Sequence, residues 1–251
     1  MERIDYDGRL HTVYAAGRAI SSAALAEWMR RFGEHAPGRR PLVVLDLGSG
    51  VGRFTPALAE AFGGPVYGVE PSSGMRGVAE ESAGHSAVTY LAGAAERIPL
   101  PDGSCDVVVL FLVWHHVRDR DAGAAEIARV LRPGGRVLMR GSFSDRLPDA
   151  PYYRFFPRLV EIEKAVFPSL EEVVGTFGRV GLERLALEAC PVRLADSLAD
   201  CAARWRMRAV STFEHLTEEE LEQGFAALDA AVAGETDPQP IFGVADLLVL
   251  G

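Results

Sequence analysis

The stretch Val44-Leu45-Asp46-Leu47-Gly48-Ser49-Gly50-Val51-Gly52-Arg53-Phe54-Thr55 decides the fold. A short apolar strand runs into three glycines at alternate positions, and a helical pattern follows. Glycine lets the backbone turn tightly and approach a ligand where a Cβ would clash, and the start of the next helix offers unpaired N–H groups. This layout is typical of nucleotide-type binding at the carboxyl end of the first strand of an α/β sheet. The G-x-G-x-G spacing differs from the dinucleotide fingerprint G-x-G-x-x-G, which disfavours a nicotinamide oxidoreductase.

Acidic residues stand near the ends of the first two strands. Asp46 precedes the first glycine by two positions, which fits a ligand that carries an amino group. Glu70 ends a second apolar strand, Val66 to Val69. An acidic side chain at that point usually holds the ribose hydroxyls, because hydroxyls donate hydrogen bonds to a carboxylate. The two carboxylates therefore predict a ligand with a ribose and an amino group.

Strands and helices alternate from residue 42 to residue 143, which predicts a parallel sheet with right-handed crossovers. Short apolar runs predict five strands, at residues 42–47, 66–69, 88–91, 106–112 and 136–140. The turn Leu131-Arg132-Pro133-Gly134-Gly135 stops a helix before the fifth of these strands, and we assign it no chemistry.

The regular alternation ends after Phe143. Capping boxes at Ser169 with Glu172 and at Thr217 with Glu220 predict the starts of two helices. The first of these helices should end near Gly181. The rest of the region should hold a strand at 182–187, helices at about 194–210 and 217–233, and a buried strand at 245–250. At the other end, residues 1–36 should be helical, and their apolar face should pack on the sheet through Leu25, Trp28, Met29 and Phe32.

Size and composition limit the possible functions. The 251 residues suit one α/β domain with an added cap, and 48% hydrophobic residues can build a large core. A net charge of −9 argues against a nucleic-acid partner, and no apolar run is long enough to span a membrane. Cysteines 105, 190 and 201 follow no metal or redox spacing, and Met1 to Asp5 lacks the apolar core of a signal peptide. We expect a cytoplasmic protein with reduced thiols and no metal.

Four motifs, in this order, resemble those of the class I S-adenosylmethionine-dependent methyltransferases, in particular the small-molecule branch of type 11 and UbiE-like enzymes. They are the glycine-rich stretch, the strand that ends in Glu70, the segment 93–106 with the apolar run 107–113, and the turn 131–135. The resemblance is close over residues 40–145. It implies a Rossmann-like, seven-stranded, mostly parallel sheet with helices on both faces and the last strand hairpinned between its neighbours. It also implies a single domain over residues 1–251, with a helical lid at 1–36, a cofactor-binding core at 40–143, and cap or substrate insertions at 144–168 and 190–243.

The resemblance implies which residues bind S-adenosylmethionine. Its methionine end would lie over Gly48, Ser49 and Gly50, with Asp46 near the amino group and Glu70 on the ribose. The other implied contacts are Pro71, Met75, Ala95 and Glu96 around the adenine, Leu110 and Phe111 near the sulfonium, and Tyr14 and Arg18 in a lid. Met75 is equally compatible with a core position, and Arg18 with a solvated one. The family commonly has aspartate where this chain has Ala94, which bears on the recognition of adenine.

Histidines follow the fourth strand, on the face where such folds bind ligands. His115 and His116 are the candidates for a general base, because an imidazole titrates near neutral pH. The alternative is that they cap the next helix or bond a loop carbonyl. Aromatic residues could line the acceptor pocket or pack in the core: Trp114, Tyr152, Tyr153, Phe156 and Trp205. Arg204, Arg206 and Arg208 could bind an anionic acceptor or form a solvated helix face.

The leading hypothesis is methyl transfer to a small organic acceptor through oxygen, nitrogen or carbon, by a monomer or a homodimer. The alternatives are a methyltransferase that acts on RNA or protein, and a cofactor-binding protein that does not methylate. The acidic charge balance and the lack of an Asn-Pro-Pro-Tyr-type motif argue against the macromolecular alternative.

Overall fold

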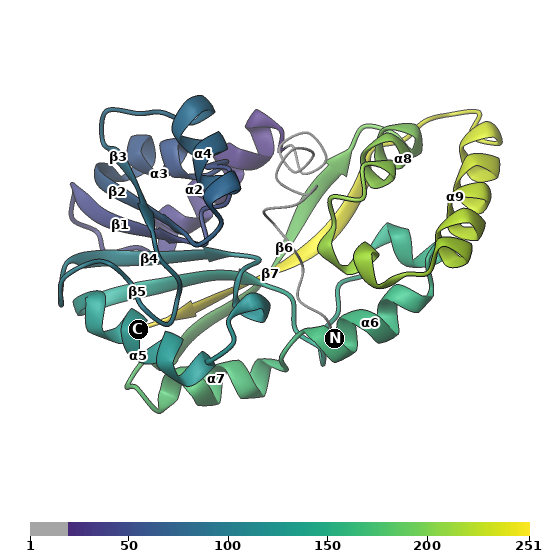
Figure 1. The fold of residues 1–251 in the computed structure, drawn as a ribbon. Coiled ribbons are helices and arrows are strands. Elements are labelled where there is room, and N and C mark those ends of the chain that lie inside the picture. The colour runs from purple at the N-terminus through teal and green to yellow at the C-terminus, as the bar shows by residue number, and fades with distance from the viewer. Residues whose placement is uncertain (1–19) are drawn as a thin grey trace.

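The computed structural model describes residues 20–251, and Figure 1 shows how its helices and strands are arranged. Its strands are β1 (Leu42–Leu47), β2 (Gly63–Glu70), β3 (Val88–Ala92), β4 (Cys105–Phe111), β5 (Leu131–Gly141), β6 (Arg184–Ala195) and β7 (Ile241–Leu250). They form one sheet in the order β3-β2-β1-β4-β5-β7-β6. The first five strands are parallel, and β7 runs antiparallel between β5 and β6. The predicted Rossmann-like sheet, with its last strand between its neighbours, is confirmed.

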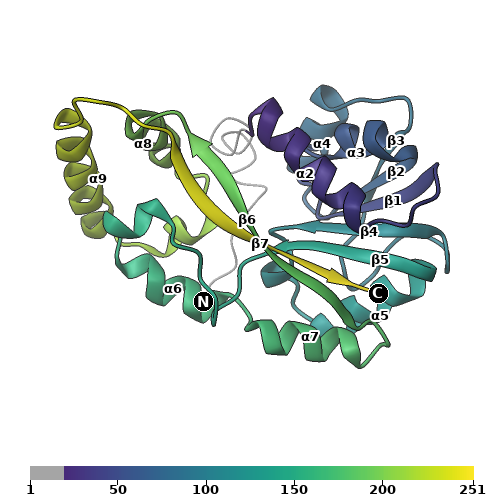
Figure 2. The ribbon, with the colours of Figure 1, turned by 180° about the vertical axis from the view of Figure 1, so that it is seen from behind.

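Helices cover both faces of the sheet. The α-helices of residues 20–251 are α2 (Ser22–His35), α3 (Thr55–Phe62), α4 (Ser73–Ser82), α5 (Arg120–Val130), α6 (Arg158–Val166), α7 (Leu170–Gly178), α8 (Leu198–Arg206) and α9 (Glu218–Ala233). Seen from either side, α2, α3 and α4 lie on one side of the sheet and α5 and α7 on the other (Figure 2). Trp28 and Phe32 of α2 are buried against the strands, which confirms the predicted apolar face. The part of the predicted N-terminal helix before residue 20 lies outside the described residues.

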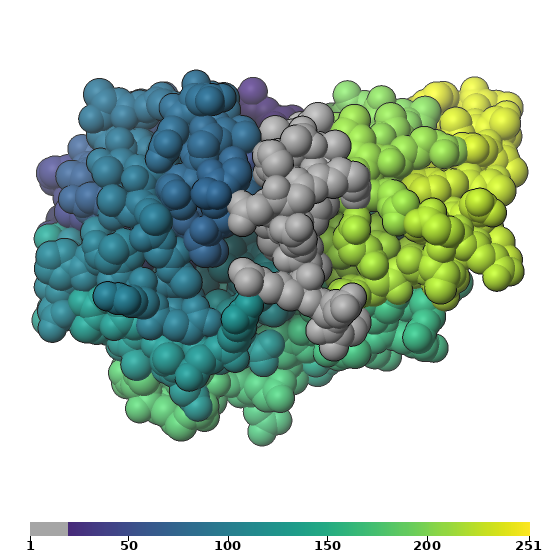
Figure 3. Space-filling view, in the orientation of Figure 1, coloured from purple at the N-terminus to yellow at the C-terminus, as the bar shows by residue number. Residues whose placement is uncertain are grey.

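A cap stands beside the carboxyl end of the sheet. It combines α6, α8 and α9 with the 3₁₀ helices η3 (Pro151–Arg154) and η4 (Ser211–His215). Strands β6 and β7 run on past the other strands and carry α8 and α9 at their far end (Figure 2). In the space-filling view the yellow and light-green atoms of α8 and α9 gather opposite the blue atoms of the β2–β3 side (Figure 3). The cap has a hydrophobic core of its own, which includes Phe156, Leu159, Phe213 and Leu228.

The strands at the cap are longer than predicted. A strand is expected at residues 182–187, and β6 is found there. It begins at Arg184 and continues to Ala195, because it pairs with β7 along its whole length. The expected helix 194–210 consequently begins only at Leu198, after the N-cap Ser197. Both capping boxes are confirmed, at Ser169 and at Thr217, and each side chain accepts a backbone N–H three residues on.

A buried carboxylate joins the amino ends of β1, β4 and β5. The Asp106 side chain is only 1% exposed. It accepts the N–H of Val43 at 2.8 Å and the Arg132 guanidinium at 2.9 Å, and it also pairs with Arg39. Burial alone would raise the pKa of Asp106, but the Val43 N–H and the two arginines lower it. The carboxylate is therefore held in its charged form.

Asp106→Asn should lower the free energy of unfolding by about 1–2 kcal/mol, because it weakens hydrogen bonds to charged partners in a buried site. Urea denaturation at neutral pH measures the change. The control is Asp121→Asn, since the Asp121 side chain pairs with Arg179 while 71% exposed. Such a surface pair contributes at most about 1 kcal/mol. Equal, small changes in the two variants would contradict the assigned role of Asp106.

None of the helices within residues 20–251 has the length and apolar character needed to cross a membrane.

Candidate active site

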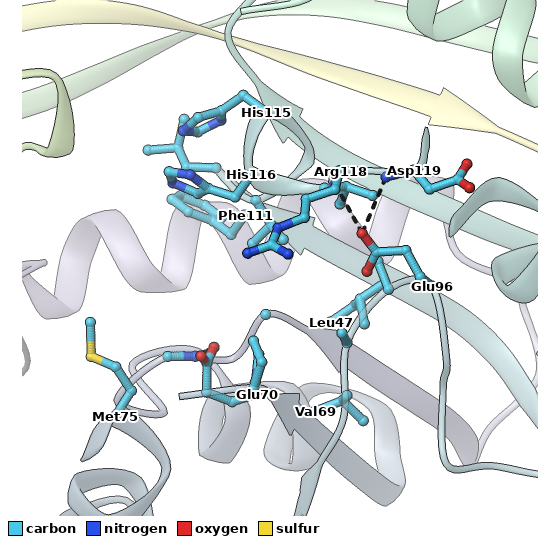
Figure 4. Close-up of a pocket in the computed structure, with 18 of the residues that line it drawn as sticks. Leu47, Val69, Glu70, Met75, Glu96, Phe111, His115, His116, Arg118 and Asp119 are labelled. Carbon is cyan, nitrogen blue, oxygen red and sulfur yellow. Dashed lines mark hydrogen bonds between the residues drawn. The ribbon is translucent and has the colours of Figure 1, made fainter. Parts of the chain in front are cut away.

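A cavity of about 880 Å³ opens at the carboxyl ends of β1, β2 and β4 (Figure 4). This volume lies within the usual range of small-molecule sites. Most of the predicted cofactor residues line it: Gly48, Gly50, Glu70, Pro71, Met75, Ala95, Glu96 and Phe111. Tyr14 and Arg18 lie outside the described residues. The cavity is thus built where parallel α/β sheets bind ligands, outside the carboxyl ends of their strands.

The glycine loop needs glycine for its backbone conformation. Gly48, Gly50 and Gly52 all have positive φ values, between 56° and 76°. A Cβ on Gly48 would come within 2.5 Å of Val113, and one on Gly52 within 2.4 Å of the Tyr90 hydroxyl. A Cβ on Gly50 would meet nothing within 4 Å, so this residue faces open space at the cavity. The loop therefore brings bare backbone to the cavity wall.

Glu70 is fixed in place at the wall of the cavity. Its carboxylate accepts the N–H of Gly50 at 3.0 Å and the N–H of Ser72 at 2.9 Å, one on each oxygen. The residue is 8% exposed and lies near Met75 in Figure 4. Each carboxylate oxygen can accept more than one hydrogen bond. The backbone thus holds an acceptor in a position where it can also receive ligand hydroxyls.

Three predicted cofactor residues lie behind the cavity wall. Asp46 is 3% exposed and accepts the Thr55 hydroxyl at 2.7 Å. Ser49 has a buried hydroxyl oxygen with no hydrogen-bond partner among the described residues. Leu110 is fully buried within the sheet. Their side chains therefore support the loop and the strand from below rather than forming the wall.

Burial raises the pKa of Asp46 from 3.8 to about 6, although the Thr55 hydroxyl and the charge of Arg53 oppose the shift. Between pH 3.8 and pH 6, the folded chain keeps a proton that the unfolded chain has lost. The contribution of this group to the free energy of unfolding should therefore fall as the pH rises through that window, and level off above it.

Asp46→Asn should remove that pH-dependent contribution, because the amide does not titrate. Urea denaturation of the wild type and the variant at several pH values from about 4 to 7 measures it. The free energy of unfolding of the variant minus that of the wild type should increase as the pH rises to about 6, and it should stay constant above that pH. A difference that does not change with pH would contradict the raised pKa.

The loops after β3 and β4 are tied together at the cavity. Glu96 accepts the backbone N–H groups of Arg118, at 2.9 Å, and Asp119, at 3.3 Å (Figure 4). Met75 is buried and also lines the cavity, so its two predicted roles, in the core and at the ligand, coincide. Arg118 lines the cavity as well, although no motif in the sequence marks this residue.

The two predicted bases follow β4 in η2 (Trp114–His116). The ring centroids of His115 and His116 are 3.9 Å apart. The His115 ring also packs edge-on against Phe167, with their centroids 4.8 Å apart. Leu112, just before η2, has a φ of 60° that is strained for a non-glycine residue. Its N–H donates to the Arg140 carbonyl at 2.9 Å, which holds this turn on β5.

Trp114 does not line the cavity. It is 3% exposed and packs on Phe177 of α7 with ring centroids 4.8 Å apart, so the structure places it in the core under the sheet. The reason is the tight turn of η2, which directs this side chain toward α7 while its neighbours His115 and His116 line the cavity.

A second cavity, of about 270 Å³, lies between the sheet and the cap. It shares Phe111, Leu112, His115 and His116 with the first cavity. The predicted acceptor residues Tyr152 and Trp205 line this second cavity. Tyr153 and Phe156 instead pack within the core of the cap. The imidazoles thus stand on the wall that the two cavities have in common.

Glu163 of α6 also lines the second cavity, although no pattern in the sequence distinguishes it from other charged helix residues. It is 2% exposed, and its carboxylate accepts the hydroxyls of Tyr152 at 2.9 Å, Tyr153 at 2.6 Å and Thr212 at 3.0 Å. Burial, together with the Glu163 charge and hydrogen bond, raises the pKa of Tyr153 well above its usual value. This cluster connects α6 to η3 and η4.

The arginines around Trp205 form ion pairs or hydrogen bonds within the chain. Arg206 pairs with Asp229 and stacks over Phe225, and Arg208 pairs with Glu218 at 3.1 Å. Arg204 donates to the Leu194 carbonyl at 2.6 Å. These contacts favour a helix face with local ion pairs. Among residues 20–251, no group of three or more His, Cys, Asp or Glu side chains is arranged to hold a metal ion.

Comparisons with known proteins agree with this geometry. A family model described as a methyltransferase domain matches residues 45–139. An uncharacterized methyltransferase of Anoxybacillus flavithermus is 31% identical over 148 residues, which cover 54% of this chain and 68% of the relative. The ubiquinone/menaquinone biosynthesis C-methyltransferase UbiE of Rubrivivax gelatinosus is 33% identical over 129 residues, 51% of each chain. The chain thus spans about half the length of that relative.

A solved structure from Anabaena variabilis, described as a candidate methyltransferase from an antibiotic biosynthesis pathway, superposes with a TM-score of 0.68. The two proteins are 25% identical, and the match covers 88% of this chain and 96% of the other. The likeness therefore includes the cap as well as the glycine-rich core.

Proposed function

Because this chain belongs to the class I methyltransferase family, we propose that it transfers a methyl group from S-adenosylmethionine to a small organic acceptor. One observation carries the proposal. The cavity beside the glycine loop and the cavity under the cap meet at a common wall, formed by Phe111, Leu112, His115 and His116. A donor bound in the first cavity and an acceptor bound in the second would react across that junction.

The residues of the first cavity suit this donor. The Glu70 carboxylate would accept the ribose hydroxyls, and the bare backbone at Gly48 and Gly50 would hold the methionine end. Met75 and the backbone at Ala95 would contact the adenine. The departure at Ala94 removes one side-chain acceptor for the adenine amine and leaves the ribose contact intact. When bound, S-adenosylmethionine supplies a methyl group that its sulfonium has already activated.

The chain then has three tasks. The cavity walls exclude water and hold the acceptor in line with the methyl group. As the acceptor's nucleophilic atom forms its bond to the methyl carbon, the electron pair of the broken bond stays on sulfur. If the nucleophile carries a proton, a neutral nitrogen of His115 or His116 receives it as general base.

The second cavity favours a small acceptor over RNA or protein. Its volume is about 270 Å³, and the chain carries a net charge of −9. A polyanion would normally need a basic face. A protein that binds the donor without transferring its methyl group remains the alternative, and experiment separates the two.

The test begins with a calorimetric titration of the purified protein with S-adenosylhomocysteine, with NADH as the control. We expect micromolar binding of the first compound alone. Mass spectrometry of small acceptors incubated with labelled S-adenosylmethionine then detects transfer. Failure to bind S-adenosylhomocysteine would overturn the donor assignment. Binding without transfer to any acceptor in a broad panel would support the non-methylating alternative.

A further inference from the structure

The Arg118 side chain reaches into the first cavity. Arg118 lines this cavity, and in Figure 4 its side chain extends into it, whereas the side chain of Asp119 points the other way. Within residues 20–251, no hydrogen bond, ion pair or ring contact engages the Arg118 guanidinium. A guanidinium carries several N–H donors and stays charged at physiological pH. These donors are therefore available to a ligand in the cavity.

Other arginines in this part of the molecule are held by carboxylates. Arg129 of α5 pairs with Asp102 at 2.7 Å, and Arg179 of α7 pairs with Asp121. Their charges are thereby balanced at the surface, outside the first cavity. Arg118 differs from them, because it leaves its positive charge in the wall of a ligand cavity.

The backbone of Arg118 is fixed at the end of the cavity proposed for the base. Glu96 accepts its N–H at 2.9 Å, and the neighbouring Ala95 is one of the residues proposed to contact the adenine. In Figure 4 the Arg118 side chain leaves the backbone beside Glu96 and extends to the side on which Glu70 lies. The guanidinium is therefore directed over the part of the cavity proposed for the adenine and the ribose.

That part of the cavity lacks an acidic side chain at one position. Ala94 lines the cavity where the family resemblance implies an aspartate for the adenine amine. A guanidinium cannot take over this role, because it donates hydrogen bonds and accepts none. It can instead stack on the plane of an aromatic base, and its N–H groups can donate to ring nitrogens or ribose oxygens. Such contacts hold a base without using its amine.

We infer that Arg118 is a donor-binding residue, which stacks on the base of S-adenosylmethionine and compensates for the alanine at position 94. This inference rests on the methyl-transfer function proposed above. The stacked guanidinium would also cover the base from water. The adenine would then be held through its ring as well as its edge, which suits a site with one acceptor fewer.

The test locates the guanidinium with three ligands. They are S-adenosylhomocysteine, S-adenosylmethionine and 5′-methylthioadenosine, which keeps the base and the ribose but lacks the amino-acid end. Calorimetric titration measures each ligand with the wild type, Arg118→Gln and Arg118→Lys. The matched control is Arg97→Gln, which removes the same charge at an exposed position of the loop after β3, outside both cavities. Thermal unfolding checks that each variant is folded.

We expect Arg118→Gln to weaken all three ligands by a similar factor, about three- to tenfold, the effect of losing a cation–π contact. Arg118→Lys should recover little of this loss, because an ammonium group lacks the planar shape of a guanidinium. Arg97→Gln should bind each ligand as the wild type does.

Several results would overturn the inference. Unchanged affinity of Arg118→Gln for 5′-methylthioadenosine, or no binding of this ligand by the wild type, would show that Arg118 does not hold the base. A loss confined to the two longer ligands would assign Arg118 to the donor's carboxylate. Tighter binding of S-adenosylmethionine alone would place the charge beside the sulfonium, and full recovery in Arg118→Lys would leave a charge effect without stacking.

The same titrations separate this inference from the proposed function. If the wild type fails to bind S-adenosylhomocysteine, the proposed function has failed. If the wild type binds it and Arg118→Gln binds all three ligands equally well, only the role of Arg118 is wrong.

Discussion

Of the variants His115→Ala and His116→Ala, one is expected to lower the rate of methyl transfer by about 100-fold, the effect of removing a general base. The two imidazoles lie 3.9 Å apart on the wall shared by the two cavities. In the proposed reaction, an acceptor hydroxyl or amine would release its proton at this junction. The imidazole that receives the proton would contribute to the rate, whereas its neighbour would mainly shape the wall.

The measurement is turnover of each variant with the acceptor found in the transfer screen, together with its affinity for S-adenosylhomocysteine. That affinity should stay at the wild-type value, because the proposed base would act on the acceptor and not on the donor. His85→Ala is the matched control, because His85 lies outside both cavities. Its ring Nδ1 accepts a hydrogen bond from the Ala87 N–H. Full turnover in both active-site variants would mean that the histidines have a structural role only.

Glu70→Ala is expected to weaken the binding of S-adenosylhomocysteine by roughly 10- to 100-fold, because in the proposed donor site the ribose hydroxyls would lose their buried acceptor. The substitution also frees the N–H groups of Gly50 and Ser72, which the carboxylate now holds. The loop and the start of α4 would therefore lose an anchor as well. Calorimetric titration measures the affinity, and thermal unfolding shows whether the fold persists.

A second substitution separates these two effects. Glu70→Gln keeps one side-chain oxygen and should retain part of the affinity. Glu60→Ala, at an exposed position of α3, serves as the control for the loss of a negative charge. If Glu70→Ala folds normally and binds S-adenosylhomocysteine as tightly as the wild type, the ribose is held by other residues.

The core of the fold could be predicted because its signals are local. The glycine loop, the acidic residue at the end of β2 and the helix caps are each encoded within a few residues. The positive φ values of Gly48, Gly50 and Gly52 show the physical reason for that glycine spacing. The order of the last three strands required the family resemblance, since periodicity alone does not fix which strands pair.

The cap could not be predicted to the same extent, because its contacts join distant parts of the chain. Glu163 looks like an ordinary charged residue of an amphipathic helix, and one of its partners, Thr212, lies 49 residues away. The extension of β6 to Ala195 depends on pairing with Ile241. Trp114 sits beside two cavity histidines in the sequence, yet a single 3₁₀ turn directs it into the core.

The separate hydrophobic core of the cap has a consequence for how such enzymes diversify. Apolar residues of η3 and α6 share one hydrophobic cluster with those of α8, η4 and α9, and this cluster contains neither the glycine loop nor Glu70. Mutations in this cluster, away from Ala165, Val166 and His215, which line the first cavity, could reshape the proposed acceptor cavity with little disturbance of the proposed donor site. A lineage could therefore acquire new products by drift or recombination within the cap alone, with its methyl donor unchanged throughout.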